Sequence, residues 1–227
     1  MAVAVITGAA SGLGAATARR LRKEGLAVAS FDLHAAGDVD AAFELDVRDA
    51  DAVEDAVART EEQLGPVDHL LTAAGVYELV PLGGIGPDQW RRMLSIHLDG
   101  TANACRSVYR RMKERGAGSI VMIGSELGLM GDPDAVHYAS AKGAIHAFAK
   151  SLAMEAVGHG IRVNCVAPGP ADTPLLTQEM RSPGYINSLV LQRIVKPEEV
   201  ADTVAFLMLE EHNFVGALLS PNAGAVV

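Results

Sequence analysis

The chain has 227 residues, of which 49% are hydrophobic and only 4% aromatic, and its formal net charge at pH 7 is −9. A chain of this length is most simply one domain, and its many small aliphatic residues suit helices packed on a parallel sheet better than a β-sandwich. The negative charge argues against binding to nucleic acid or to an anionic membrane, because both need positive charge on the protein.

The two cysteines, Cys105 and Cys165, lie far apart inside apolar segments. Nothing resembles the spacing of metal ligands, so we expect no metal site and two buried free thiols in a reducing compartment. No apolar stretch is long enough to span a bilayer, and there is no signal-peptide pattern, so we expect a cytoplasmic protein.

The N-terminal part predicts a strand, a helix and a second strand. Residues 2–7 form a short β-branched apolar run, a helical pattern continues to Lys23, and Gly25 is a signal for the helix end. Residues 27–31 predict the second strand, which ends on Asp32. A strand, helix and strand in this order predict a parallel sheet.

Glycines 8, 12 and 14 lie on the turn between the first strand and the first helix. They let the backbone approach a phosphate, and the helix N-terminus supplies unpaired N–H groups and a partial positive charge. Together with an acid at the end of the next strand, this turn predicts a dinucleotide site. Asp32 can accept hydrogen bonds from both adenosine ribose hydroxyls and would repel a 2′-phosphate, which favours NAD over NADP. The alternative for Asp32 is a solvated loop acid.

The remaining elements alternate between strands and helices. Only a loop, not a crossover helix, is expected between Asp32 and a third strand at 42–45. The pattern predicts helices at 49–64, 87–115, 138–159 and 197–209, and strands at 67–72, 119–124, 161–167 and 217–220. We therefore expect an α/β fold with one Rossmann-like doubly wound parallel sheet flanked by helices, in a single domain over residues 1–227. Residues 174–196 mix apolar and polar residues with only a weak hydrophobic periodicity, which suits a mobile substrate lid.

Tyr138 and Lys142 are four residues apart, so they project from the same face of the helix. A tyrosine with its ordinary pKa near ~10 is a poor base at neutral pH, and a nearby positive charge lowers that pKa. Lowering it by about three units requires roughly 4 kcal/mol, which a lysine together with a cationic cofactor ring could supply. Ser125, at the end of the strand 119–124, could hold an alcohol or carbonyl oxygen beside the tyrosine. The alternative for the Tyr–Lys pair is an ordinary surface contact.

These motifs resemble, in their order and over essentially the whole length, those of the short-chain dehydrogenase/reductase family. Segment 7–14 resembles the cofactor loop TGxxxGxG, segment 73–75 the NAG element, and segment 168–173 the nicotinamide loop. The cofactor-binding residues that the resemblance implies are Gly8, Ser11, Gly12, Leu13, Gly14, Asp32, Leu33, Asp46, Val47, Ala73, Ala74, Gly75, Tyr138, Lys142, Pro168, Gly169, Ala171 and Thr173.

The resemblance implies an NAD(H)-dependent oxidoreductase that interconverts a secondary alcohol and a ketone. Tyr138 would be the general acid/base, Lys142 would lower its pKa and bind the nicotinamide ribose, and Ser125 would orient the substrate oxygen. The alternative is a catalytically impaired NADH-binding regulatory protein.

Two residues depart from the family pattern. His97 stands where the family has an asparagine that holds a water for proton relay, and Ala73 replaces the asparagine of the NAG element. His97 could preserve the relay through its backbone carbonyl or relay protons itself, because imidazole titrates near neutral pH. The alternative is a helix histidine without a relay role. We count His97 among the catalytic candidates.

The lid contains several apolar residues, which favours an apolar or cyclic substrate. Arg181 and Arg193 in the same segment leave an acidic substrate as an alternative. Cyclic alcohols, dihydrodiols, hydroxysteroids and hydroxyacyl compounds all remain candidates. We expect Glu126 to face solvent and His146 to be an ordinary packing or surface residue. In relatives, helices corresponding to 88–115 and 138–159 pair across a two-fold axis, which implies a homodimer or homotetramer.

Overall fold

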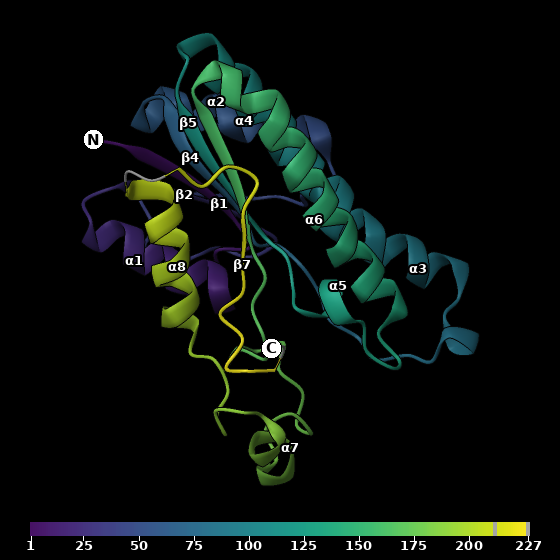
Figure 1. Cartoon of the computed structure of the whole chain (residues 1–227). Helices are drawn as coiled ribbons and strands as arrows, with labels where there is room; N and C mark the ends of the chain where they lie inside the picture. The colour runs from purple at the N-terminus through teal and green to yellow at the C-terminus, as the bar shows by residue number, and fades with distance from the viewer. Residues whose placement is uncertain (211–212, 226–227) are drawn as a thin grey trace.

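The centre of the molecule is a parallel sheet. A computed structural model describes residues 1–210 and 213–225. In this part of the chain the sheet has seven strands in the order β3-β2-β1-β4-β5-β6-β7, and every neighbouring pair is parallel (Figure 1). The strands are β1 (Val3–Thr7), β2 (Ala27–Asp32), β3 (Ala41–Glu44), β4 (Val67–Thr72), β5 (Gly118–Ile123), β6 (Ile161–Val166) and β7 (Leu218–Leu219). The predicted single-domain α/β fold is confirmed.

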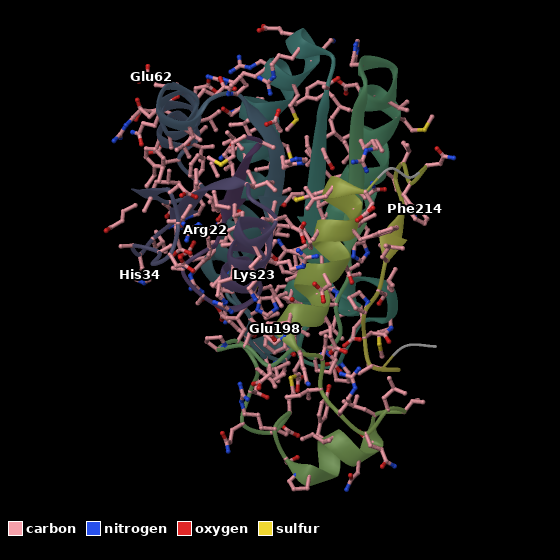
Figure 2. The ribbon with its side chains drawn as sticks, turned by 90° about the vertical axis from the view of Figure 1, so that its left-hand side faces the viewer. Arg22, Lys23, His34, Glu62, Glu198 and Phe214 are labelled. Carbon is pink, nitrogen blue, oxygen red and sulfur yellow. The ribbon has the colours of Figure 1, made fainter. Side chains whose placement is uncertain are left out.

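Helices cover both faces of the sheet, with α1 and α8 side by side on one face and α2, α4 and α6 on the other (Figures 1 and 2). Arg20 links the first pair by donating to Asp202 Oδ1 over 2.7 Å. Because both faces are covered, the strands are almost continuously apolar. The main helices are α1 (Gly12–Lys23), α2 (Ala50–Leu64), α4 (Gly100–Arg115), α6 (Val136–Ala156) and α8 (Pro197–Leu209).

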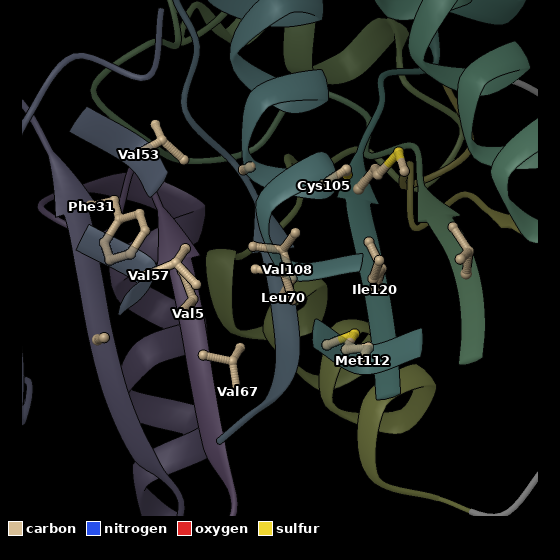
Figure 3. Packing of buried hydrophobic residues seen from close by; sticks show 14 of the residues in the cluster. Val5, Phe31, Val53, Val57, Val67, Leu70, Cys105, Val108, Met112 and Ile120 are labelled. Atoms are coloured by element: carbon tan, nitrogen blue, oxygen red, sulfur yellow. The ribbon is translucent and has the colours of Figure 1, made fainter. Parts of the chain in front are cut away.

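The larger core lies between the sheet and the three helices of the second face. Phe31, Val57, Val108 and Ile120 come from two strands and two helices and belong to this one cluster (Figure 3). The ring of Phe43 meets that of Phe31 edge to face, with 5.6 Å between the centroids. The cluster fixes the sheet against α2 and α4, and so fixes the strand ends that carry the polar motifs.

The connection between β2 and β3 is a loop, as predicted. Residues 33–40 form no helix, and Ala36 and Val39 pack against the apolar cluster on the α1 face. The backbone N–H of Asp40 donates to the carbonyl of Val28 over 2.9 Å. The loop therefore covers part of the sheet where a crossover helix would otherwise lie.

The long predicted helix 87–115 is interrupted. It consists of α3 (Pro87–Leu94), a π-helical turn (Ser95–Asp99) and α4. His97 lies inside this turn and is almost completely buried. Single π-helical turns within α-helices are frequent at functional sites, because they displace one residue from the regular ladder.

The predicted helix 138–159 also has different bounds, because α6 begins at Val136 and a 3₁₀ turn (Val157–His159) follows its end.

The strand order reverses between β1 and β4, and ligands of such sheets bind outside the carboxyl ends of the strands at that point. The glycine turn follows β1, Ala73 follows β4, Ser125 closely follows β5, and Pro168 closely follows β6. The segment after β6, which contains α7 (Pro183–Ser188), extends from this edge of the sheet (Figure 1).

Other expectations concern the chain as a whole. Among the described residues, no helix combines the length and apolarity that a membrane crossing requires. The same residues contain no group of three or more His, Cys, Asp or Glu side chains arranged to hold a metal ion. Cys105 and Cys165 are buried and free, as predicted. The cytoplasmic location stays a prediction.

Replacement of Gly14 by alanine tests the close approach of α1 to the glycine turn. A Cβ at position 14 would lie 2.1 Å from the carbonyl oxygen of Gly8, so the helix must shift. Overpacking costs about 1–3 kcal/mol, and a chain of this size loses about 2–4 °C of Tm per kcal/mol. We expect Gly14→Ala to lower the Tm by about 2–12 °C in calorimetry. Gly158→Ala, at a position with no atom within 4 Å of the added Cβ, is the control. Equal Tm values for the two variants would contradict this packing.

Candidate active site

The glycine turn after β1 is built from backbone that leaves no space for side chains. Gly8 has φ +74°, and a Cβ there would lie 2.7 Å from the backbone of Ala74. The Gly8 N–H donates to the carbonyl of Phe31 over 2.8 Å. Ser11 precedes α1 without capping it through its side chain. The first N–H groups of α1 therefore remain available to an anion such as a phosphate.

Asp32 joins the end of β2 to this turn. Its Oδ2 accepts from the N–H of Ala10 over 3.0 Å, and its Oδ1 accepts from the N–H of His34 over 3.1 Å. These bonds hold the carboxylate in one orientation, and each oxygen keeps a further lone pair for a ligand hydroxyl. The next residue, Leu33, is exposed and also borders the cavity described below.

Asp46 and Val47 follow β3 on the same side. Arg48 donates to Asp46 through its Nε at 2.9 and 3.0 Å, and the guanidinium lowers the pKa of that carboxyl. Val47 is buried against Gly100, where a Cβ would lie 2.6 Å from Val47 Cγ2. Together they make one polar and one apolar wall, suited to the edge and face of a flat base.

The turn after β4 is fixed from β1. Thr7 Oγ1 accepts from the N–H groups of Ala73 and Ala74 over 3.1 and 3.2 Å. Gly75 lies directly under an imidazole, since a Cβ there would come within 2.4 Å of His97 Cε1. The glycine therefore makes the space that the His97 ring occupies.

His97 is held through its ring. Its Nε2 lies 2.8 Å from the carbonyl oxygen of Val76 and 3.2 Å from the N–H nitrogen of the same residue. The shorter distance favours the tautomer that donates from Nε2, which leaves Nδ1 as an acceptor. Nδ1 is buried and has no hydrogen-bond partner among the described residues. Burial, with a contribution from the charge of Lys142, lowers the pKa of His97 to about 3, so the ring is neutral at pH 7.

Tyr138 faces this imidazole. Its ring meets that of His97 edge to face at 5.4 Å between centroids and that of Tyr77 at 4.8 Å. Burial raises the pKa of Tyr138 to about 12, against a lowering by the hydrogen bond with Ser125. The charge of Glu126 adds to the rise. In the absence of other charges the phenol is therefore protonated at neutral pH.

Lys142 lies on the same face of α6, as its spacing from Tyr138 predicts. Its side chain is buried, and its Nζ donates to the carbonyl of Ile123 over 2.9 Å. The Nζ lies 5.6 Å from the centroid of the Tyr138 ring. Burial lowers the pKa of Lys142 to about 8, so the ammonium form still predominates at pH 7.

Ser125 is held by a residue that sequence reasoning missed. His146 Nε2 accepts from the N–H of Ser125 over 3.3 Å, and Ser125 Oγ accepts from the N–H of Leu127 over 3.2 Å. The imidazole is packed between two glycines, because a Cβ on Gly124 or Gly128 would come within 2.3 or 2.7 Å of it. Burial lowers the pKa of His146 to about 4, which keeps the ring neutral as an acceptor. In the sequence, the only hint of this contact was the pair of glycines near Ser125, Gly124 and Gly128, which leave space for a neighbouring side chain.

Glu126 corrects another expectation. The carboxyl does not face solvent, since the residue is only 5% exposed and lines the cavity. Its N–H donates to the carbonyl of Pro168 over 3.1 Å, which turns the residue inward.

The segment after β6 borders the same space. The N–H of Gly169 donates to the carbonyl of Pro221 over 3.2 Å, and Thr173 lies against Gly12. Arg181 contacts Asp172, and Arg193 donates to both carboxyl oxygens of Glu199 at 2.7 Å.

Neither Arg181 nor Arg193 lines the cavity. Within the described residues, these two arginines therefore do not offer a charge to an acidic substrate.

All the predicted site residues border one cavity of about 620 Å³. It continues into the lid, where Leu175, Leu176, Met180, Tyr185 and Leu189 form an apolar wall. Sequence reasoning did not assign Arg48, Tyr77, Asp132 or Glu126 to it. The residues predicted and found here are Gly8, Ser11, Gly12, Leu13, Gly14, Asp32, Leu33, Asp46, Val47, Ala73, Ala74, Gly75, His97, Ser125, Tyr138, Lys142, Pro168, Gly169, Ala171 and Thr173.

Comparison with known proteins gives consistent matches over most of the chain. The family model described as short chain dehydrogenase matches residues 2–183. Cis-4-hydroxycyclohexanecarboxylate dehydrogenase of Sinomonas cyclohexanicum is 38% identical, over 98% of this chain and 95% of the relative. The 2,3-dihydro-2,3-dihydroxybenzoate dehydrogenase of Bacillus subtilis (strain 168) is 34% identical, over 91% of this chain and 88% of the relative.

A solved structure is similar throughout. The 3-ketoacyl-(acyl-carrier-protein) reductase from Brucella melitensis, complexed with NADH, superposes with a TM-score of 0.92. It is 28% identical, and the match covers 98% of this chain and 97% of that chain. The chain therefore belongs to the short-chain dehydrogenase/reductase family of oxidoreductases.

Proposed function

We propose that this protein is an NAD(H)-dependent enzyme that interconverts a secondary alcohol and a ketone. The observation that carries the proposal is one continuous cavity with two chemically different ends. One end has the glycine turn and Asp32, and the other has Ser125, Tyr138 and Lys142.

The residues at the first end fit a dinucleotide. The N–H groups of α1 and the glycine backbone suit the diphosphate, Asp32 suits the adenosine ribose, and the Asp46–Val47 pair suits the adenine. The carboxylate of Asp32 would repel a 2′-phosphate, which supports NAD over NADP. When bound, NAD would supply the acceptor for the hydride that leaves the alcohol carbon.

The residues at the second end suit proton transfer. Ser125 Oγ would orient the substrate oxygen, and Tyr138 would take the proton of the alcohol or return it to the ketone oxygen. With a pKa of about 12, Tyr138 holds its proton at pH 7, and added positive charge is needed to make it a stronger acid and to populate the phenolate that accepts a proton. Lys142 supplies part of that charge and would bind the nicotinamide ribose.

His97 would continue the proton path. Its buried Nδ1 is an acceptor without a partner among the described residues, so it would hold a water or a ligand hydroxyl. The ring is neutral at pH 7 and its Nε2 faces the Val76 carbonyl, so His97 would position the relay water through Nδ1 rather than carry the proton itself. We infer that His97 takes over the relay role of the asparagine found in relatives.

The lid favours an apolar or cyclic carbon skeleton. Leucines 175, 176 and 189 and Met180 border the cavity. The Sinomonas and Bacillus relatives are both named for ring substrates that carry hydroxyl and carboxylate groups, which supports the ring skeleton.

We also propose a homodimer or homotetramer. Met154 on α6 is 77% exposed, and Phe206 on α8 and Val215 are partly exposed. Phe214 is also partly exposed and lies beside the C-terminal part of the chain (Figure 2). The rings of Phe206 and Phe214 are in contact, with 5.8 Å between their centroids, and contiguous exposed apolar groups mark protein–protein interfaces.

Tyr138→Phe tests the acid/base role. Turnover should fall by about 10²–10⁴-fold, because the variant cannot transfer the proton, while NADH binding should stay nearly unchanged. NADH formation is followed by absorbance with cyclic alcohols, diols, steroids and hydroxyacyl thioesters, and NADH affinity by fluorescence. Tyr109→Phe, outside the cavity on α4, is the control. Equal turnover in Tyr138→Phe and the parent enzyme would refute the role.

Asp32→Asn tests the cofactor choice. The amide keeps the shape of the side chain but removes the charge that opposes a 2′-phosphate. We expect the ratio of kcat/KM for NADP to that for NAD to rise by at least about tenfold, which corresponds to 1.4 kcal/mol. Glu62→Gln removes one charge from the exposed surface of α2 and should leave the ratio unchanged. A parent enzyme that prefers NADP would overturn the assignment.

His97→Leu and His97→Asn test the relay. Leucine cannot hold a water, so kcat should fall by about tenfold or more with little change in the KM for NAD, whereas asparagine should retain most of the rate. Since the pKa of His97 is near 3, neither variant should remove a titration step between pH 5 and 9 from the profile of kcat. Full activity in His97→Leu would mean that the ring has only a packing role.

A further inference from the structure

Glu126 is a buried acid that the proposed reaction does not use. It is 5% exposed, and its Oε2 has no hydrogen-bond partner among the described residues. Its backbone is fixed, because its carbonyl accepts from Leu129 over 2.8 Å and from Met130 over 3.1 Å. Gly169 leaves space for the carboxyl, since a Cβ there would lie 2.7 Å from Oε2. A buried oxygen of this kind is costly unless a ligand pairs with it.

Tyr77 provides a second unpaired group in the same cavity. Its hydroxyl is buried without a partner among the described residues, while its ring packs edge to face on that of Tyr138. Burial raises the pKa of Tyr77 and of Tyr138, and the charge of Glu126 makes a smaller contribution to each rise. Two unsatisfied polar groups therefore lie near the reacting phenol.

Among the described residues, no arginine of the cavity wall is left to pair with Glu126. Asp132 also lines the cavity. Burial raises the pKa of Glu126 to about 7, and the negative charge of Asp132 adds to that rise. Among the described lysines and arginines of the cavity wall, Arg48 pairs with Asp46 and Arg92 with Glu78, and Lys142 donates to a carbonyl.

A hydroxyl pairs with both Glu126 and Tyr77 without bringing a further charge into the cavity. A hydroxyl can donate to the carboxyl oxygen and accept from the phenol. An ammonium group could donate to both, but it would share the cavity with the positive charge of Lys142, which disfavours a second cation. A carboxylate can accept from Tyr77 but would face Glu126 and Asp132, both of which disfavour a further negative charge.

We propose that Glu126 and Tyr77 form a second polar subsite, which binds a substrate hydroxyl other than the one that reacts at Tyr138. The preferred substrate is then a cyclic diol or polyol rather than a simple alcohol or a hydroxy acid. This inference rests on the proposed function for the identity of the reacting group, but the subsite itself can be tested by binding alone.

The test compares ligands that differ in one group. Ligand-observed NMR measures the Kd of each ligand for the Tyr138→Phe variant with NADH bound. The ligands are cyclohexanol, the 1,2-, 1,3- and 1,4-cyclohexanediols, 2-aminocyclohexanol and 2-hydroxycyclohexanecarboxylate. The same ligands are assayed for turnover with the parent enzyme and NAD. Each measurement is repeated with Glu126→Met, Glu126→Gln and Tyr77→Phe added. Glu179→Met, on the exposed part of the lid outside the cavity, is the matched control.

We expect the best diol to bind at least about tenfold more tightly than cyclohexanol, a factor that should disappear in Glu126→Met and shrink in Tyr77→Phe. Glu126→Gln should keep part of this preference for the diol, and the control Glu179→Met should keep all of it. Diol binding that depends on Glu126 without any turnover would support the subsite and refute the reaction. Turnover of cyclohexanol as fast as any diol, with or without Glu126, would overturn the subsite alone. A preference for the amino alcohol or for the hydroxy acid would also overturn it.

Discussion

Tyr138 and Lys142 are buried together where neither a phenolate nor an ammonium group is well solvated. Desolvation raises the pKa of the first to about 12 and lowers that of the second to about 8, so the phenol is a weak acid that keeps its proton at pH 7. Other features of the site lower the pKa of Tyr138 or suit a ligand that would lower it. The hydrogen bond with Ser125 lowers the tyrosine pKa, and the cavity leads from Tyr138 to a glycine turn and an acid that suit a dinucleotide with a cationic nicotinamide ring.

Much of the fold and most of the cavity wall could be predicted because the information is local. Each motif directly follows or closely follows a strand, and the carboxyl ends of parallel strands meet at one edge of the sheet. Given the observed strand order, the glycine turn, Asp32 and Ser125 converge at that edge. The loop after Asp32 was also predictable, because the chain between β2 and β3 is too short and irregular for a crossover helix.

Features that depend on contacts between distant segments could not be predicted. Glu126 was expected in solvent, yet its N–H bonds to Pro168 and its carboxyl occupies space left by Gly169. His146 holds the backbone of Ser125, and the His97 ring needs the missing side chain of Gly75. Each case pairs a polar side chain with a glycine or a backbone group far away in the sequence, which no local pattern reveals.

The most direct test of this account is a titration of Tyr138 itself. Tyrosinate absorbance near 295 nm is measured against pH for the parent enzyme and for Tyr138→Phe, each with and without NAD, and the difference gives the pKa of this one residue. Without NAD we expect no difference signal up to roughly pH 10, since burial holds the pKa near 12. With NAD we expect the midpoint to fall by about two units or more, because positive charge beside the phenol stabilises the phenolate. The same midpoint with and without NAD would contradict the proposal that cofactor charge and Lys142 together turn this buried phenol into a base.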